Sequence, residues 1–250
     1  LVLRSWYYFH LINFFGVAYN QGNPETDLGV PLKLDATVTG QFFTRNTVKE
    51  VYARIEQDLL RGNKLLSTNR YDRNFFRIDH LAAKAILSRV YLYMEDWDKA
   101  LAYADSVLMV KSNLLDLNDG GRVYNTSSTP DEIIWVREYS EGYSISFQPR
   151  LSPPFILSEN LIDIYTDNVD FRKSLFLYYN STITRGYPGI SKASSDYGKM
   201  QGIRTAELYL NRAEAYVRKY LAGGQDEFRL KALADLNKLR ENRYDTRTTA

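Results

Sequence analysis

The sequence contains few histidine or cysteine residues that could carry acid–base or metal chemistry. Histidine occurs twice, as His10 and His80, and cysteine does not occur, so thiolate nucleophiles, thiolate metal sites and disulfides are excluded within these residues. We expect His10, in an apolar run, to be a hydrogen-bonded packing residue. We expect His80, in the first turn of a helix, to be exposed. A metal shared by the two or a histidine base is the weaker alternative.

Acidic residues are numerous, but no pair is distinguished as an acid–base pair. Glu207 and Glu214 are seven positions apart and share a helix face. Asp163, Asp167 and Asp170 could offer oxygen ligands to Ca²⁺, although capping of helix ends is the favoured interpretation. Hydrolase, zinc-protease, P-loop and dinucleotide-binding motifs are absent. A glycosidase pair is neither selected nor excluded, and the sequence favours a protein that is not an enzyme and holds no cofactor.

Aromatic residues are the compositional outlier, with 20 Tyr, 12 Phe and 3 Trp. A sugar has apolar ring faces and a rim of hydroxyls, so its site combines exposed rings with polar side chains. Loops between residues 111 and 200 supply this mixture. The candidate ligand-binding residues are Tyr143, Phe147, Gln148, Tyr179, Asn180, Tyr187 and Tyr197. The alternative is that these rings pack the loops against helices, as we expect of Trp135 in its apolar, β-prone run.

These loops need a frame, and apolar spacing predicts that the frame is helical. The expected long helices cover residues 3–15, 47–62, 78–94, 98–110, 203–220 and 228–241. The first is apolar on nearly every side and is expected to be buried. Thr47 and Glu50 have the spacing of a capping box, Asp96 is an expected N-cap, and Gly62 is expected to end its helix.

Residues 83–110 have the layout of a tetratricopeptide repeat. Tyr91 occupies the aromatic position of the first helix, and Ala100 is the small residue where two helices cross closely. A looser copy covers residues 206–237, and residues 5–15 with 48–60 form a third pair; an unrelated hairpin is the alternative. We predict one mainly α domain over residues 1–250, an α-α superhelix of tetratricopeptide-like hairpins at 1–110 and 201–245. An irregular, loop-rich, ligand-facing insert with short strands covers 111–200.

Several blocks, in order along the chain, resemble the SusD/RagB family of nutrient-binding lipoproteins. The family's pattern Ala-x-x-Ala, Arg-Val-Tyr-Leu-Tyr and Asp-Trp-x-x-Ala is matched within residues 82–107. The blocks are Leu3–Gly16, Gly29–Leu32, Arg45–Tyr52, Ile55–Leu59, Ala82–Val107, Glu132–Trp135, Ser158–Leu161, Asp170–Arg172, Arg204–Ala215 and Ala232–Arg240. The family's signal, its lipidated Cys and its closing C-terminal section are absent, so we expect a fragment.

The resemblance implies glycan or peptide capture at the bacterial cell surface and delivery to a SusC-like, TonB-dependent outer-membrane transporter. It also implies attachment to the outer membrane by a lipid anchor outside this chain. Lys and Arg total 32 and Asp and Glu total 30, a balance that gives no reason to expect a nucleic-acid partner. The alternative function is a tetratricopeptide scaffold that binds peptides inside the cell, against which the long insert argues.

Overall fold

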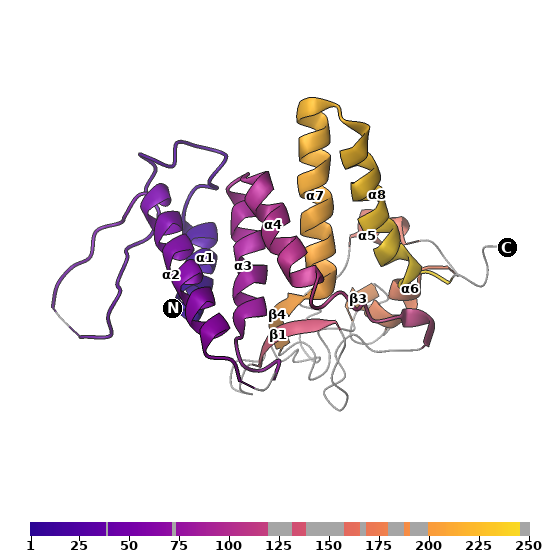
Figure 1. Cartoon of the computed structure of the whole chain (residues 1–250), viewed down its shortest axis with the longest axis horizontal. Helices are drawn as coiled ribbons and strands as arrows, with labels where there is room; N and C mark the ends of the chain where they lie inside the picture. The colour runs from indigo at the N-terminus through magenta and orange to yellow at the C-terminus, as the bar shows by residue number, and fades with distance from the viewer. Residues whose placement is uncertain are drawn as a thin grey trace.

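The long helices of this chain stand side by side in a row, with small strands below them (Figure 1). The computed structural model describes residues 1–38, 40–71, 74–119, 132–138, 158–165, 169–179, 188–190 and 200–245. The long helices are α1 (Val2–Phe15), α2 (Val48–Thr68), α3 (His80–Tyr93), α4 (Trp97–Leu108), α7 (Thr205–Gly223) and α8 (Asp226–Glu241). Each packs against the next one, which confirms the predicted mainly α fold of stacked helical hairpins.

The shorter elements lie between α4 and α7 in the sequence. They are η1 (Leu117–Asp119), β1 (Ile133–Glu138), α5 (Glu159–Ile164), α6 (Phe171–Phe176), β2 (Leu177–Tyr179), β3 (Pro188–Ile190) and β4 (Met200–Arg204). β1 pairs with β4 in an antiparallel ladder that sets Trp135 opposite Ile203, and β2 pairs with β3. Short strands between residues 111 and 200 are therefore confirmed, while the domain and insert boundaries stay a prediction.

Side-chain caps fix where the frame helices begin. Thr47 and Glu50 form the predicted capping box, with the Glu50 backbone N–H donating to Thr47 Oγ1 at 3.2 Å and Thr47 N–H donating to the Glu50 carboxylate at 2.9 Å. Asp96 caps α4 through the Lys99 N–H, as predicted, and Asp79 caps α3. Gly224 ends α7 with φ at 68°, a left-handed conformation that glycine adopts without strain.

The hairpin of α3 and α4 crosses as closely as the repeat pattern predicts. Ala100 is fully buried, and its carbonyl accepts a hydrogen bond from Ser88 Oγ at 3.0 Å. A hydroxyl can reach a backbone carbonyl of a neighbouring helix only where the two backbones lie near each other. Ala213 on α7 is also buried, at 3% exposure. Small residues at these crossings therefore set the spacing of the frame.

Two predictions at the first hairpin are wrong. Gly62 does not end α2, which continues to Thr68; instead α1 passes so close that a Cβ at Gly62 would lie 2.5 Å from Val2 Cγ2. Nor is α1 buried all round, because its neighbours α2 and α3 cover only part of its surface. The large apolar side chains that stay exposed on it are Leu3, Tyr7, Leu11, Phe14 and Phe15.

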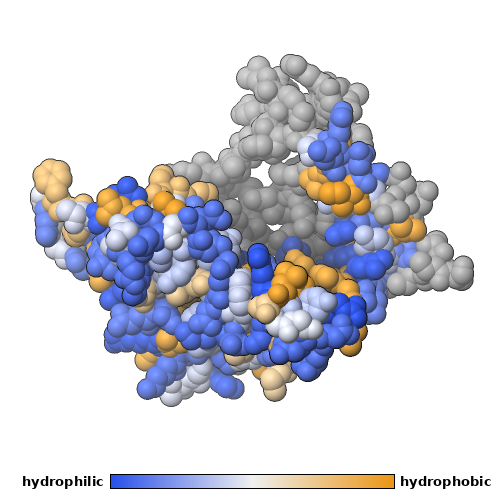
Figure 2. All heavy atoms as spheres, turned by 90° about the horizontal axis from the view of Figure 1, so that it is seen from above, coloured by the Kyte–Doolittle hydropathy of each residue, from blue (hydrophilic) through white to orange (hydrophobic). Residues whose placement is uncertain are grey.

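The C-terminal hairpin also departs from the sequence prediction. Ile203 belongs to β4 rather than to the helix, because it pairs with β1 and is fully buried there. Of the leucines on α8, only Leu239 packs against the core, while Leu230, Leu233 and Leu236 stay exposed. Figure 2 shows the apolar surface that remains over this hairpin. The most exposed of these residues are Leu210, Leu221, Leu230 and Leu233.

Candidate functional site

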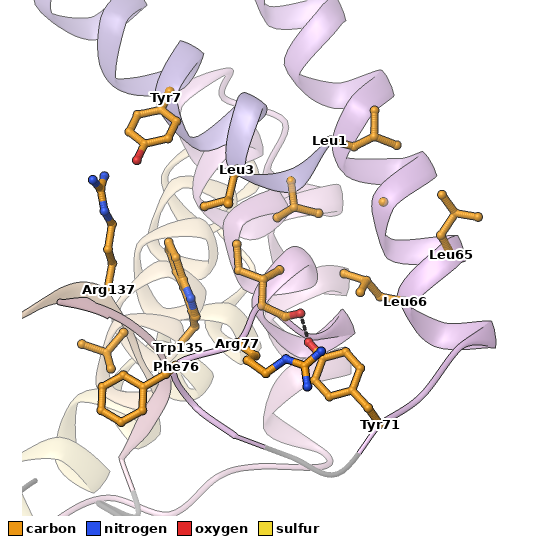
Figure 3. A pocket seen from close by; sticks show the side chains of 14 residues that line it. Leu1, Leu3, Tyr7, Leu65, Leu66, Tyr71, Phe76, Arg77, Trp135 and Arg137 are labelled. Carbon is orange, nitrogen blue, oxygen red and sulfur yellow. Dashed lines mark hydrogen bonds between the residues drawn. The ribbon is translucent and has the colours of Figure 1, made fainter. Parts of the chain in front are cut away.

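A pocket of about 820 Å³ opens where four segments meet: the start of α1, the end of α2, the loop before α3, and β1. Figure 3 shows the side chains of these segments around it. The lining residues are Leu1, Val2, Leu3, Tyr7, Gly62, Leu65, Leu66, Tyr71, Phe76, Arg77, Ile78, Trp135, Val136 and Arg137. Tyr7 and Phe76 are each 44% exposed, so the pocket is open to solvent. Its volume suits a small ligand.

The loop before α3 is held against β1 by backbone hydrogen bonds. The Val136 N–H donates to the Phe75 carbonyl at 2.8 Å, and the Phe75 ring packs on Val136. Asn74 folds the next residues into a turn, since its side-chain oxygen accepts from the Phe76 N–H and its carbonyl accepts from the Arg77 N–H, both at 2.9 Å. The turn carries Phe76 and Arg77 into the pocket lining.

Two arginines stack on tyrosines at the pocket. The Arg77 guanidinium lies 4.2 Å from the centre of the Tyr71 ring, and the Arg137 guanidinium lies 5.1 Å from that of Tyr7. Figure 3 shows the two pairs on different sides of the pocket, with Trp135 between them. No Asp or Glu occurs among the lining residues of the described chain, so the charged groups of the lining are cationic.

The Tyr71 hydroxyl forms a hydrogen bond within the protein, because it donates to the Ile78 carbonyl. Burial raises the pKa of this hydroxyl, the charge of Asp79 raises it further, and the charge of Arg77 opposes both. A phenol with a raised pKa keeps its proton at neutral pH. Tyr71 therefore closes the loop and offers its ring, rather than its oxygen, to the pocket.

The inner wall of the pocket is rigid. Trp135 is only 3% exposed, as the sequence predicted, and meets Trp6 edge to face with ring centres 5.2 Å apart. The Arg89 guanidinium also lies against Trp6, 4.9 Å from the ring centre, and Arg89 forms a bidentate ion pair with Glu207 at 2.6 Å. This chain of contacts runs from β1 through α1 and α3 to α7, and so connects the pocket to the helical frame.

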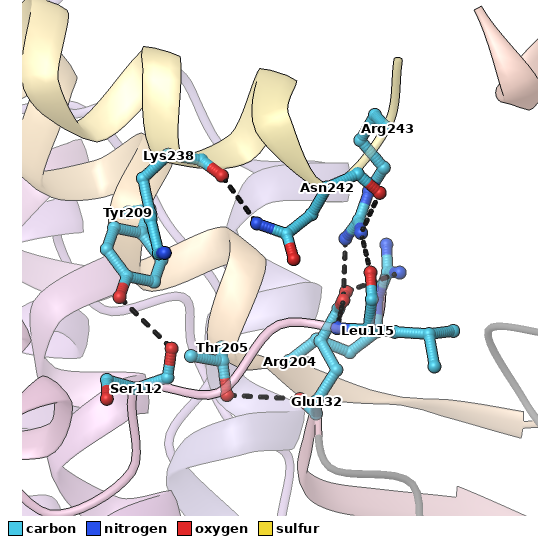
Figure 4. A network of polar contacts seen from close by, with 9 residues as sticks. All are labelled: Ser112, Leu115, Glu132, Arg204, Thr205, Tyr209, Lys238, Asn242 and Arg243. Atoms are coloured by element: carbon cyan, nitrogen blue, oxygen red, sulfur yellow. Dashed lines mark hydrogen bonds and ion pairs between the residues drawn. The ribbon is translucent and has the colours of Figure 1, made fainter. Parts of the chain in front are cut away.

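A buried carboxylate fixes the segment that enters β1. Glu132 is fully buried; its carboxylate accepts from Arg243 at 2.6 Å, from Arg204 at 3.1 Å and from the Leu115 N–H at 3.0 Å. We call these four residues the Glu132 network (Figure 4). The Glu132 carbonyl also accepts from Thr205 at the start of α7. The network joins the segment after α4, β1, the start of α7 and the end of α8.

The two histidines do not form a site. His10 packs among Trp6, Phe9 and Phe14, as predicted, and its Nε2 has no hydrogen-bond partner in the described chain. Burial, followed by the charge of Arg89, lowers the pKa of His10. His80 lies on another helix, where it begins α3, and it is partly buried rather than exposed.

The aspartate cluster is divided by the structure. Asp170 forms an ion pair with Arg172 at 2.6 Å and its side chain is fully buried. Asp163 lies in α5, and Asp167 lies outside the described residues. Within the described ranges, no group of three or more metal-ligating side chains comes together. The same ranges contain no helix with the length and apolar character needed to cross a bilayer.

Comparison with known proteins agrees with this architecture. Residues 1–92 match the sequence model of a SusD-like family described as "Starch-binding associating with outer membrane". A SusD superfamily protein from Bacteroides thetaiotaomicron superposes with a TM-score of 0.77 at 22% identity, over 99% of this chain and 58% of that one. The chain therefore resembles the SusD-like family in sequence over residues 1–92, and it has the fold of SusD superfamily structures over nearly its whole length. No curated protein matches this SusD-like chain in sequence.

Two further solved structures have the same fold. A putative sugar binding protein from Bacteroides vulgatus is 26% identical, with a TM-score of 0.71 over 96% of this chain and 56% of its own length. A laminarin binding SusD-like protein is 18% identical, with a TM-score of 0.67 over 97% of this chain and 63% of its own length. This SusD-like chain thus spans less than two thirds of the length of the structures that it matches.

The pocket is not where the sequence placed the ligand. Of the predicted residues, Tyr179 is described only as backbone of β2, and the others lie outside the described residues: Tyr143, Phe147, Gln148, Asn180, Tyr187 and Tyr197. They stay predictions for this SusD-like chain. The sequence held one signal for the pocket, the aromatic and basic stretch that runs from Tyr71 to Arg77 between two helices.

Proposed function

We propose that this chain binds a saccharide and is not a catalyst. The observation that carries the proposal is the open pocket beside α1, where the exposed rings of Tyr7 and Phe76 face solvent next to two guanidinium groups. Exposed rings stack on the apolar faces of sugars, while charged and polar groups at the rim bind their oxygens. The starch-binding description of the matching family and the laminarin binding and sugar binding relatives support this class of ligand.

The place of action is part of the same proposal. The matching family is described as associating with the outer membrane, which supports a position at the bacterial cell surface. We propose attachment by a lipid anchor outside this chain, and a SusC-like, TonB-dependent transporter as the protein that receives the ligand. In this arrangement the row of helices would be the frame, and the pocket and the region of residues 111–200 would face the ligand.

Calorimetric titration with a panel of neutral and acidic oligosaccharides tests the proposal. At least one saccharide should bind, and Tyr7→Ala or Phe76→Ala should weaken its binding by about ten-fold or more, as expected when an anchoring ring is truncated. Phe14→Ala is the matched control, because Phe14 is an exposed ring on the same helix that does not line the pocket. Its affinity should equal that of the unmodified protein.

Three results would contradict parts of this proposal. If no saccharide binds and peptides do, the scaffold alternative is correct. If a saccharide binds but the pocket variants bind normally, the site lies elsewhere, and alanine variants of Tyr143, Tyr179, Tyr187 and Tyr197 then test the loop prediction. If incubation releases smaller saccharides above a buffer control, the protein is an enzyme.

A further inference from the structure

The charged side chains of the pocket are hydrogen-bond donors only. A guanidinium has five N–H donors and no acceptor, and the lining contains Arg77 and Arg137 but no Asp, Glu, Asn or Gln. Sites for neutral sugars need acceptors as well, because each hydroxyl donates as well as accepts. The described lining therefore suits a ligand whose polar atoms accept hydrogen bonds and carry negative charge.

Arg77 is the lining cation whose charge is not paired with an acid in the described chain. In the described chain its guanidinium contacts the Tyr71 ring, and no carboxylate lies within ion-pair distance of it. Other arginines of the described chain have their charge paired with an acid, as Arg89 does with Glu207 and Arg212 with Asp235. An arginine that is oriented but carries no counter-ion is available to an anionic ligand.

The contacts of Arg77 also pre-orient it. Its backbone is held by the Asn74 turn, and Tyr71, on which it stacks, is itself tied down by the hydrogen bond to Ile78. A guanidinium stacked on a ring keeps its N–H donors in its own plane, where two of them can meet the two oxygens of a carboxylate. Less side-chain freedom is then lost when the ligand binds.

A second guanidinium lines the same pocket. Arg137 stands over Tyr7, and both arginines line one cavity whose walls are otherwise mainly apolar. Apolar walls lower the local dielectric constant and so strengthen the attraction for an anion. Tyr7 and Phe76 remain to stack on sugar rings, so the lining combines ring-stacking surfaces with an anion-binding group.

From this geometry we propose that the pocket selects acidic saccharides, with Arg77 binding the anionic group and Tyr7 and Phe76 stacking on sugar rings. The inference rests on the proposed function, because it names the ligand class of the same pocket. A uronic acid carboxylate fits the fork of a guanidinium directly, and a sulfate ester offers the same anionic oxygens. The substitution on the saccharide, rather than its backbone sugar, would then decide affinity.

The test compares trigalacturonate with its methyl ester, which has the same rings without the charge, and with a sulfated galactose trisaccharide. Titration at low salt should show the acid, the sulfate or both binding at least ten-fold more tightly than the ester. Arg77→Gln should remove this preference, so that acid, sulfate and ester bind with similar affinity, while Arg77→Lys should keep part of it. Arg61→Gln is the matched control, since Arg61 is exposed on α2 and does not line the pocket.

The outcomes separate the two proposals. Equal affinity for acid, sulfate and ester, with binding still lost in Tyr7→Ala, overturns the anionic preference and leaves saccharide binding standing. A preference that survives Arg77→Gln unchanged removes the assigned role of Arg77. Absence of binding by all three probes overturns the inference, and the wider saccharide panel then decides whether the proposed function fails with it.

Discussion

Replacing Glu132 by glutamine should destabilise the protein strongly although the two side chains have nearly the same shape. Glu132 is fully buried, and it neutralises Arg243, whose side chain is 9% exposed. In Glu132→Gln the charge disappears, and an amide NH₂ must face guanidinium groups or the Leu115 N–H, so that donors meet donors. The variant therefore leaves a buried cation without its counter-ion.

The size of the effect follows from the burial of each partner. Removing one member of a buried ion pair costs about 3–5 kcal/mol, because the remaining charge stays desolvated. Arg204 adds little, since its side chain is 29% exposed and water can replace the lost contact, as for surface pairs worth about 0–1 kcal/mol. For a chain of this size, the total corresponds to a fall in melting temperature of about 6–20 °C.

Urea unfolding followed by circular dichroism measures the loss, with Glu214→Gln as the control. Glu214 pairs with Arg218 at 3.6 Å on the surface of α7, where both side chains are about half exposed, so its loss should cost within about 0.5 kcal/mol. Added salt should weaken the difference between the two variants only slightly, because buried pairs are poorly screened. Equal stabilities for the two variants would refute the assigned role of the Glu132 network.

Three other predictions address the frame. Ala100→Trp and Ala213→Trp should each lower the melting temperature markedly, since overpacking a helix crossing costs about 1–3 kcal/mol or more; unchanged melting in both would contradict the repeat assignment. Gly202→Ala should destabilise the β1–β4 pair, because the new Cβ would lie 2.0 Å from the Trp135 carbonyl oxygen; normal stability by urea titration would disprove that close approach. Burial lowers the pKa of His10 in the folded chain, so the free energy of unfolding should fall as the pH drops through about 6.5, the unfolded value, towards the folded value. His10→Phe should flatten that part of the stability profile, and an identical profile in the variant would show that His10 titrates normally.

Local signals in the sequence predicted the frame well. Two helix starts could be predicted from spacing alone, those at Thr47 with Glu50 and at Asp96. In both, side chains accept hydrogen bonds from backbone N–H groups within three residues. The position of Ala100 could also be predicted, because the tetratricopeptide pattern places a small residue at a fixed distance along the chain, where the two helices cross. Such features depend on neighbours in the chain and need no knowledge of the tertiary packing.

Features that depend on distant partners were missed. Gly62 resembles a helix stop in the sequence, and only the approach of Val2 shows that it is a packing position. The pocket is similar: Tyr7, Tyr71, Arg77 and Arg137 come from three separate segments, and no spacing rule joins them. The aromatic surplus led to candidate ligand residues between 111 and 200, and these stay a prediction.

The antiparallel pairing of β1 with β4 has a consequence for how this protein can change. Residues 133–138 and 200–204 lie side by side, so the chain leaves the frame and returns to it at neighbouring points. Closing a longer connection between fixed ends costs only about 0.6 kcal/mol for each doubling of its length. A change in the length of the stretch from 139 to 199 should therefore cost little chain entropy, because the pairing of β1 with β4 keeps its two ends in place.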